Sequence, residues 1–423
     1  MKGELHRTRR AVIGVAVAAL AIGTAAACGS DSDTSAGAGT ADPAVLGPPN
    51  AATADVVTIG FIGEGKSAAV DASAEFTAAQ AAVAYINEHL GGLRGHRVQL
   101  KTCETKSNPA AATDCANQMI SAGAVAVVEG ALGNVDQTID VLAPAGVPLV
   151  LNYATSQKSL SSPNVVTLMN GVSAIFGTPA ALAKEKNVTK SALVTIDVPA
   201  ATGAANQMGK LAFGNAGSAL EVVTIPPGTP DVTSQITAAN RNDPGLWTVL
   251  GNTNFCSGVL KAIKTVDRGA TIVVNDRCVD STISSSIPGG FEGVQVGTTA
   301  NLDPATDDMK LFQAAIDKYQ PGLRIEYNAA GGWQPIVGLA RALNATPGQE
   351  VTRQTVAEGL RSAPAQPYPL TNGIQFQCNG QAFPLSPNVC SSDIIVATAD
   401  KGGVLRDYRI LRADASLFTP PSR

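Results

Sequence analysis

VVTIGFI (56–62), AEFTAAQAAVAYINEH (74–89) and HRVQLKTCE (96–104) follow one another along the chain and decide the fold. The first is an unbroken apolar run rich in β-branched residues, which is typical of a parallel strand buried on both faces. The second predicts a helix, ended by Gly91-Gly92, whose one apolar face carries Phe76, Ala79, Val83 and Ile86. The third alternates like a strand. This order predicts a strand–helix–strand unit of a parallel sheet.

The same alternation continues outward from this unit in two series. The first series has predicted helices at about 109–122 and 135–144 and strands at 124–130 and 147–152. The second begins near residue 172, with helices at about 173–186, 203–217, 232–241 and 255–266 and strands at 191–197, 220–226, 246–251 and 270–276. Helices at about 305–319, 327–343 and 352–361 follow, and hairpins begin at Ile374. We therefore predict an α/β fold with two doubly wound, Rossmann-like lobes joined by a hinge.

Length and composition agree with two ordinary domains. The chain has 423 residues, of which 45% are hydrophobic and 15% are charged, as in globular proteins. The formal net charge of the chain is −4. The first 27 residues alone carry a net charge of +3. The rest is more acidic still, which argues against a nucleic-acid partner because phosphate binding needs clustered Lys and Arg.

The N-terminus has the pattern of an export signal. Four basic residues precede an apolar run from Ala11 to Ile22, and the small residues Ala25-Ala26-Ala27 precede Cys28. A Cys in this place resembles a bacterial lipobox, although Ala25 stands where Leu is usual. We predict a signal peptide at 1–27, lipidation of Cys28, and a flexible tether at 28–54 that is rich in Gly, Ser, Ala and Pro. The alternative is an uncleaved membrane anchor, and either interpretation puts residues 29–423 outside the cytoplasm.

Cysteine parity supports export to an oxidising compartment. Of seven cysteines, lipidation would use Cys28 and leave six, which fall into three local pairs. The simplest pairing is Cys103–Cys115, Cys256–Cys278 and Cys378–Cys390. Buried free thiols are the alternative.

Several stretches resemble the leucine/isoleucine/valine-binding proteins, which have the type I periplasmic-binding fold of ABC importers. The resemblance lies in the order and spacing of TIGFIGE (58–64), AAVAYINEHLGGLRGHRVQL (81–100), SNPAAATDCANQMISAGAVAVVEG (107–130) and AGVPLVLNYAT (145–155). It implies a hinge-closing ligand cleft and a permease partner in the membrane. It also implies a first lobe of 55–168 with 298–364 and a second of 169–297 with 365–423.

Two motifs for other functions are weak in this chain. GFIGEGKS (60–67) matches a phosphate-binding P-loop, but Gly60 falls inside the predicted strand, which leaves the loop too short to wrap a phosphate. Only three histidines occur, and no nucleophile elbow or zinc-protease motif accompanies them. We therefore expect no enzyme activity, no metal and no cofactor.

NYATS (152–156) is the most informative candidate site, because it follows a predicted buried strand where open α/β sheets place ligands. Backbone N–H groups beside Tyr153 and Ala154, with the Thr155 hydroxyl, would hold a ligand carboxylate. The family resemblance implies that role for Ala154 and Thr155. An ordinary turn is the alternative for Thr155.

The resemblance implies further ligand contacts at other strand ends. Asn134 follows strand 124–130, where the family commonly has a Ser, and Asp276 falls near an acidic residue that binds the ligand ammonium. Asp276 paired only with Arg277 is the alternative. Asn252 ends another strand, and Thr202 stands where the family often has a stacking aromatic. That departure puts a branched-chain amino acid in doubt.

We therefore expect a monomeric solute-binding protein, lipid-anchored at the outer face of the cytoplasmic membrane, whose lobes close around a small polar or amphipathic ligand. An amino-acid-like molecule, an amide or an organic acid would fit. One rival is a sensing module that reports to a separate membrane receptor. A secreted hydrolase is another, which the shortage of histidine disfavours.

The lipidation of Cys28 is directly testable. Cys28→Ser should remove the lipid, detectable by mass spectrometry, and release the protein from the membrane fraction, since stable anchoring needs two or more chains. Unchanged membrane retention of the variant would favour an uncleaved anchor instead.

Overall fold

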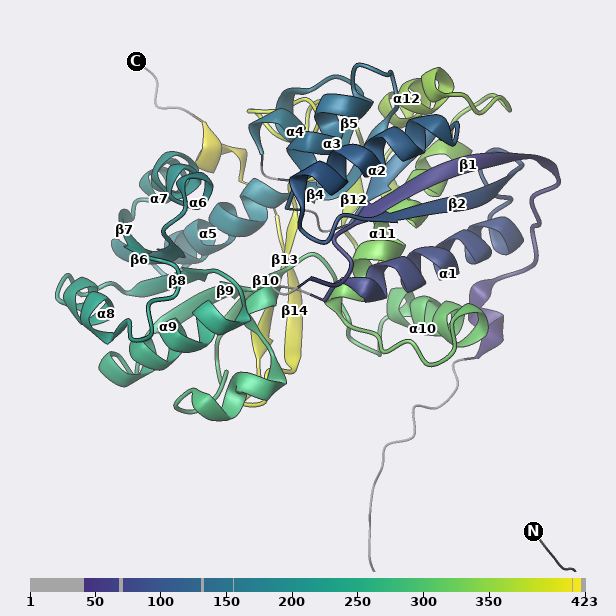
Figure 1. Ribbon diagram of the computed structural model, residues 1–423. Helices are drawn as coiled ribbons and strands as arrows, with labels where there is room; N and C mark the ends of the chain where they lie inside the picture. The colour runs from purple at the N-terminus through teal and green to yellow at the C-terminus, as the bar shows by residue number, and fades with distance from the viewer. Residues whose placement is uncertain (1–41, 68–70, 131–132, 155, 413, 420–423) are drawn as a thin grey trace, which may run out of the picture. The chain divides into compact units, whose positions relative to one another are not determined.

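The computed structural model describes residues 42–67, 71–130, 133–154, 156–412 and 414–419, and the chain from Thr40 onward forms one compact unit. Its first sheet has five strands, all parallel, in the order β2-β1-β3-β4-β5 (Figure 1). The strands are β1 (Ala54–Gly63), β2 (His96–Glu104), β3 (Ala126–Glu129), β4 (Leu149–Ala154) and β5 (Val165–Asn170). The predicted parallel α/β fold is confirmed. The strand β5, however, lies in a segment for which the sequence analysis predicts no strand.

Helices cover both faces of this sheet because alternate strand residues point to opposite sides. Ile59, Phe61 and Val128 point toward α1 (Ser73–His89), α10 (Asp307–Tyr319) and α11 (Tyr327–Asn344) (Figure 1). Ile62 and Val127 point toward α2 (Pro109–Ser121) and α3 (Val135–Leu142). The short α4 (Gln157–Ser161) and α12 (Arg353–Ser362) complete this lobe.

The second sheet has seven strands in the order β14-β13-β10-β9-β8-β6-β7. Five are parallel to one another: β6 (Lys190–Ile196), β7 (Ala219–Ile225), β8 (Leu246–Leu250), β9 (Thr271–Asn275) and β10 (Gln295–Thr298). The late strands β13 (Ile394–Ala399) and β14 (Leu405–Leu411) add an antiparallel edge. Residues of α8 (Thr233–Asn240) and α9 (Thr253–Val266) pack in one core and those of α5 (Thr178–Glu185) and α7 (Lys210–Asn215) in another.

Two segments lie elsewhere than the predicted domain boundaries put them. Residues 42–53, expected in the tether, pack on the first lobe: Leu46 is only 4% exposed, and the backbone N–H of Asn50 donates to the Glu88 carbonyl. Residues 366–390, expected in the second lobe, join the first. They include β11 (Gln366–Pro367) and β12 (Gln375–Phe376), and Val389 pairs with Thr167 at the free edge of β5. The burial of Leu46 decides the first placement, and the free edge of β5 decides the second. Local composition shows neither feature.

Three disulfides join the pairs that the spacing predicts, with separations of 12, 22 and 12 residues. Cys103–Cys115 ties β2 to α2, and Cys256–Cys278 ties α9 to the turn after β9. Cys378–Cys390 closes the loop beside β5. The predicted pairing is confirmed.

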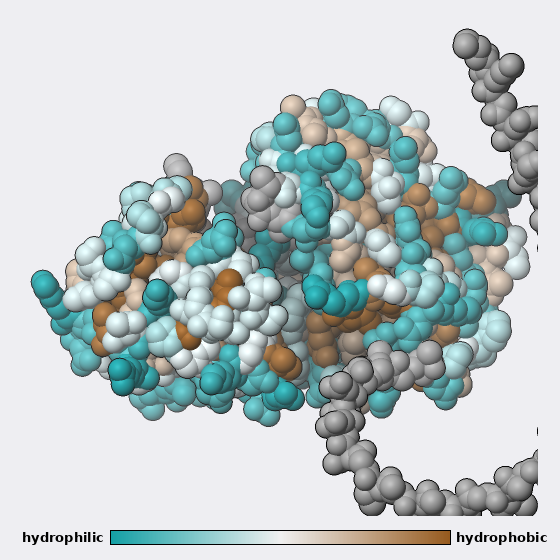
Figure 2. Space-filling model, turned by 60° about the horizontal axis from the view of Figure 1, so that its bottom comes forward, coloured by the Kyte–Doolittle hydropathy of each residue, from teal (hydrophilic) through white to brown (hydrophobic). Residues whose placement is uncertain are grey.

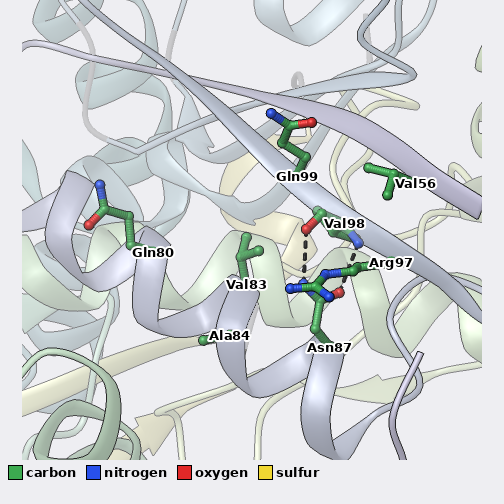
Figure 3. A pocket seen from close by; sticks show the side chains of 8 residues that line it. All are labelled: Val56, Gln80, Val83, Ala84, Asn87, Arg97, Val98 and Gln99. Atoms are coloured by element: carbon green, nitrogen blue, oxygen red, sulfur yellow. Dashed lines mark hydrogen bonds between the residues drawn. The ribbon is translucent and has the colours of Figure 1, made fainter. Parts of the chain in front are cut away.

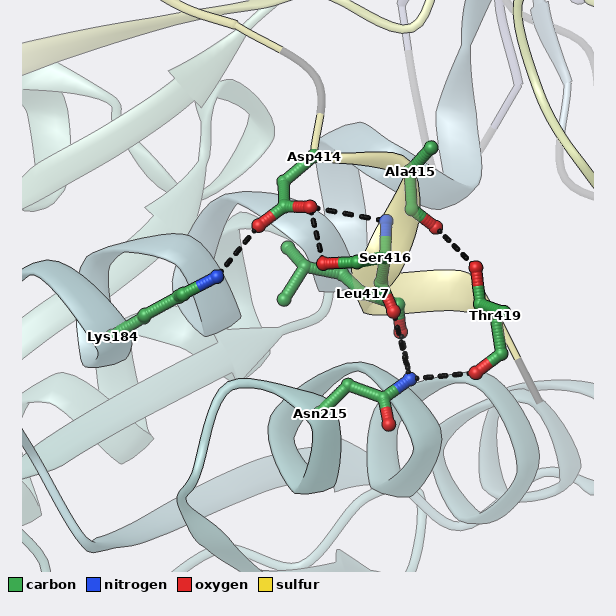
Figure 4. Close-up of polar contacts among 7 residues, drawn as sticks. All are labelled: Lys184, Asn215, Asp414, Ala415, Ser416, Leu417 and Thr419. Atoms are coloured by element: carbon green, nitrogen blue, oxygen red, sulfur yellow. Dashed lines mark hydrogen bonds and ion pairs between the residues drawn. The ribbon is translucent and has the colours of Figure 1, made fainter. Parts of the chain in front are cut away.

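The end of the described chain is fastened to the second lobe (Figure 4). Asp414 pairs with Lys184 of α5 at 2.8 Å, and the Asn215 amide of α7 donates to the carbonyls of Ser416, Leu417 and Thr419. On the face shown in Figure 2, polar residues cover most of the surface and apolar ones appear in scattered areas. None of the described helices is long and apolar enough to cross a membrane.

Arg361 of α12 generates a stability prediction. Its guanidinium donates to the Val165 carbonyl of β5 at 2.9 Å, to the Pro387 carbonyl at 2.6 Å and to the Asn388 side-chain oxygen at 2.8 Å. Arg361→Leu leaves these acceptors without their donor and should lower the free energy of unfolding by about 2–4 kcal/mol in urea denaturation. Arg241→Leu, at an exposed arginine, should change it by less than about 0.5 kcal/mol. Equal effects of the two substitutions would contradict a structural role for Arg361.

Candidate functional site

The two lobes contact each other where parallel strands of both sheets end. Tyr153 is the penultimate residue of β4, and Arg277 lies in the 3-10 turn Asp276–Cys278 directly after β9. The Arg277 Nη2 group donates to the Tyr153 hydroxyl at 3.0 Å. Ligands of open α/β sheets bind at such carboxyl ends, so this contact marks the candidate ligand cleft.

Asp276 lies in the same cluster. Its carboxylate accepts a hydrogen bond from the Thr298 hydroxyl at 3.1 Å. Burial raises the pKa of Asp276, while the neighbouring Arg277 charge and the hydrogen bond from Thr298 oppose that rise. The Asp276 charge in turn contributes to the raised pKa of Tyr153, whose first cause is burial. The sequence therefore identifies two residues, Tyr153 and Asp276, that the fold brings together from different lobes.

Arg277 is a cation among acidic groups from both lobes. Its pKa is raised, first by Tyr153 and then by Asp276, Glu64 and Glu75, against the opposing effect of burial. Glu64 follows β1, is 7% exposed, and accepts from the Gly133 backbone N–H at 2.9 Å. Glu75 in the first turn of α1 is 1% exposed. In the sequence, Arg277 stands out only as a neighbour of Asp276, and no pattern marks either glutamate.

Glycines provide the space that the Glu75 side chain occupies. A Cβ at Gly130 or Gly331 would lie 2.5 or 2.7 Å from its carboxylate oxygens, and one at Gly332 would lie 1.9 Å from its backbone carbonyl. Side chains at these positions would displace the glutamate or separate α1 from α11. The Gly331-Gly332 pair inside a predicted helix was the available signal, because glycine in a helix interior usually has a packing reason.

Glu129, the last residue of β3, is fully buried. Neither carboxylate oxygen has a hydrogen-bond partner within the described residues. Burial raises its pKa to about 8. The carboxyl is therefore mostly protonated at neutral pH.

The other predicted ligand contacts have separate surroundings. Asn252 caps α9 by accepting from the Phe255 N–H at 3.0 Å, and the Thr202 hydroxyl donates to Asp197 at 3.3 Å. Asn134 precedes α3 without capping it. Ala154 ends β4, and Thr155 and Cys28 lie outside the described residues. Within the described chain, no hydrogen bond links Asn134, Thr202 or Asn252 to the Tyr153–Arg277 pair.

Figure 3 shows a pocket of about 410 Å³ that lies away from this cluster, between α1 and the strands β1 and β2. Asn87 projects into it, but its amide is paired with the backbone N–H and carbonyl of Val98 at 2.8 and 2.9 Å. That polar group therefore serves the helix–strand contact. The described residues contain no group of three or more His, Cys, Asp or Glu placed to hold a metal ion.

Comparisons with known proteins agree with this architecture. A family model described as "Periplasmic binding protein" matches residues 16–402. No curated protein matches the sequence.

Solved structures with the same fold include the LivJ substrate-binding protein of Streptococcus pneumoniae in complex with isoleucine, at 18% identity and a TM-score of 0.66. That alignment covers 85% of this chain and 100% of the other. An R. palustris solute-binding protein in complex with 4-hydroxybenzoate aligns at 16% identity and a TM-score of 0.68, covering 85% and 97%. A fatty acid ABC transporter substrate-binding protein from Thermomonospora curvata aligns at 14% identity and a TM-score of 0.69, covering 87% and 96%.

The raised pKa of Glu129 predicts a pH dependence of stability. The folded state keeps a proton up to about pH 8, whereas an unfolded chain releases it near the ordinary value of 4.5. Folding stability should therefore fall as pH rises from 4.5 to 8, by at most about 1.4 kcal/mol per pH unit from this group. Glu129→Gln should flatten this slope in urea denaturation between pH 5 and 8. Glu350→Gln, at an exposed position, should leave the slope unchanged, and parallel curves for wild type and Glu129→Gln would contradict the prediction.

Proposed function

Because the chain belongs to the periplasmic binding protein family, we propose that it is the extracytoplasmic solute-binding component of an ABC importer. The contact between Tyr153 and Arg277 carries this proposal, since it joins strand ends of two lobes where a ligand would lie. Binding shifts the lobes toward a closed form if the ligand has a higher affinity for that form. The closed form then docks on a membrane permease.

The proposed ligand is a small polar or amphipathic molecule, such as an amino-acid-like compound, an amide or an organic acid. Solved proteins of this fold are described with isoleucine or with 4-hydroxybenzoate, so the fold alone leaves the ligand class open. We place a ligand carboxylate at Ala154 and Thr155. A ligand amine would pair with Asp276: burial raises the pKa of this carboxyl, and a cation beside it would counter that rise and favour the ionised form.

Asn134, Thr202 and Asn252 are proposed as further contacts when the cleft is occupied. The absence of an aromatic residue at Thr202 leaves more room above the ligand than a stacking side chain would. This favours ligands other than the branched-chain amino acids.

We place the protein at the outer face of the cytoplasmic membrane, anchored by a lipid on Cys28. The two lobes follow the tether, and the protein is a monomer in this proposal. A sensing module that signals to a separate receptor is the second candidate, because the same ligand-dependent closure serves either partner. Genes for a permease and an ATPase beside this one would favour transport.

A ligand screen followed by two substitutions tests the site. Amino acids, amides and small organic acids should be screened by thermal shift, because a ligand of the native state raises its melting temperature. For a ligand with an amine, calorimetry should show that Asp276→Ala costs several kcal/mol of affinity, since it leaves a buried ammonium unpaired. Thr155→Ala should cost about 1.5–3 kcal/mol by losing one charge-assisted hydrogen bond.

Asp307→Ala is the matched control, because Asp307 is an exposed carboxylate on α10. It should bind the ligand like wild type. An amine ligand that Asp276→Ala binds as tightly as wild type would exclude the cross-cleft pairing.

A further inference from the structure

Arg277 has an unusual set of neighbours for a cation at an interface between lobes. Its side chain reaches solvent although groups of both lobes surround it, and the hydrogen bond to the Tyr153 hydroxyl is the one that this side chain makes within the described residues. None of the ion pairs of the described chain includes it. A guanidinium has five N–H donors, so most of its hydrogen-bonding capacity remains for another partner.

The partner that it has is a weak one. A phenol hydroxyl offers the guanidinium one neutral acceptor, whereas a carboxylate offers two oxygens of opposite charge that the planar guanidinium can bind together. The nearby carboxylates are already engaged by their own lobes: Asp276 with Thr298 and Glu64 with the Gly133 N–H. The contact with Tyr153 is therefore one that a carboxylate, as the stronger acceptor for a guanidinium, can replace.

We infer that Arg277 is a specificity-determining residue that exchanges the Tyr153 hydroxyl for a carboxylate of the ligand. This inference rests on the proposed solute-binding function and narrows its ligand class to organic anions. Tyr153 lies near the end of β4 in the first lobe and Arg277 follows β9 in the second, so a carboxylate that takes the place of the Tyr153 hydroxyl lies between the two lobes. One ligand group then bridges both lobes.

The surrounding charges limit how much negative charge the ligand carries. Asp276, Glu64 and Glu75 stabilise the guanidinium and repel additional anions. A single carboxylate, alone or in a zwitterion, is therefore favoured over multiply charged anions such as phosphate or citrate. Arginine suits this role better than lysine, because its planar fork matches the two oxygens of a carboxylate.

Acetate is the minimal probe of this exchange, and it requires no knowledge of the natural ligand. At 100 mM and matched ionic strength, acetate should raise the melting temperature of the wild type more than chloride or acetamide does. Arg277→Gln should abolish the difference, Arg277→Lys should keep part of it, and Tyr153→Phe should increase it because a competing acceptor is gone. Arg268→Gln, at an exposed arginine of the same lobe, should behave like wild type.

Larger ligands, each compared with its own amide, distinguish a failure of this inference from a failure of the proposed solute-binding function. Benzoate and benzamide, and isoleucine and isoleucinamide, should be compared by calorimetry on the full chain, with urea midpoints confirming that each variant is folded. We expect a preference for the carboxylate that falls at least tenfold in Arg277→Gln. Acetate stabilising Arg277→Gln as much as wild type, no acetate effect on wild type, or weaker acetate binding by Tyr153→Phe would each overturn the inference. Binding of an amide as tight as that of its acid would overturn it too, and would leave the solute-binding function standing.

Discussion

The chain passes between its two sheets three times, and the backbone at each passage has to satisfy its polar groups where little water reaches. The chain crosses from one sheet to the other after β5, after β10 and again before β13. The Asn170 amide at the end of β5 donates to the Ser392 hydroxyl before β13 at 3.0 Å, which ties the first passage to the third. Gln334 of α11 donates to the carbonyls of Thr299 and Pro369 at 2.8 and 2.9 Å, which fixes the second. These buried amides fix the crossing segments relative to one another, and the crossing segments set how the two lobes, and the candidate cleft between them, are placed.

The sequence was most informative where periodicity and strand ends carry the signal. The apolar runs of β1, β4 and β9 locate Tyr153 and Asp276 at strand termini, and a parallel sheet brings such termini to one edge. The strand β5 was missed because its apolar residues follow the short helix α4 and precede a helical segment, so no alternation marks it. The placement of residues 366–390 was missed because it depends on a contact between Val389 and Thr167, more than 200 residues apart.

The buried and interface charges show a different limit. Glu75 and Glu129 look like ordinary surface positions in the sequence, and only packing shows that both are buried. Glu75 is buried because Gly130 and Gly331 let a strand end and α11 approach it. Arg277 was visible in the sequence, but its partner on the other lobe depends on how two separately wound sheets face each other. Local pattern therefore predicted which strand ends supply the candidate site, and tertiary contact decided which side chains meet there.

The strength of the contacts between the lobes bears on how binding works. Tyr153–Arg277 and the hydroxyl pair of Tyr327 and Tyr408, at 2.7 Å, connect elements of different lobes. Hydrogen bonds of these kinds contribute about 0.5–3 kcal/mol each. Moving a two-state equilibrium from 1:99 to 99:1 takes about 5.5 kcal/mol of differential affinity. Contacts of this size are too weak to hold the lobes shut by themselves, and in the function that we propose the ligand supplies the remaining stabilisation of the closed form. If the lobes close around a ligand as we propose, a modest hydrogen bond between them suits that role, because a strong ion pair in its place would close the lobes without ligand.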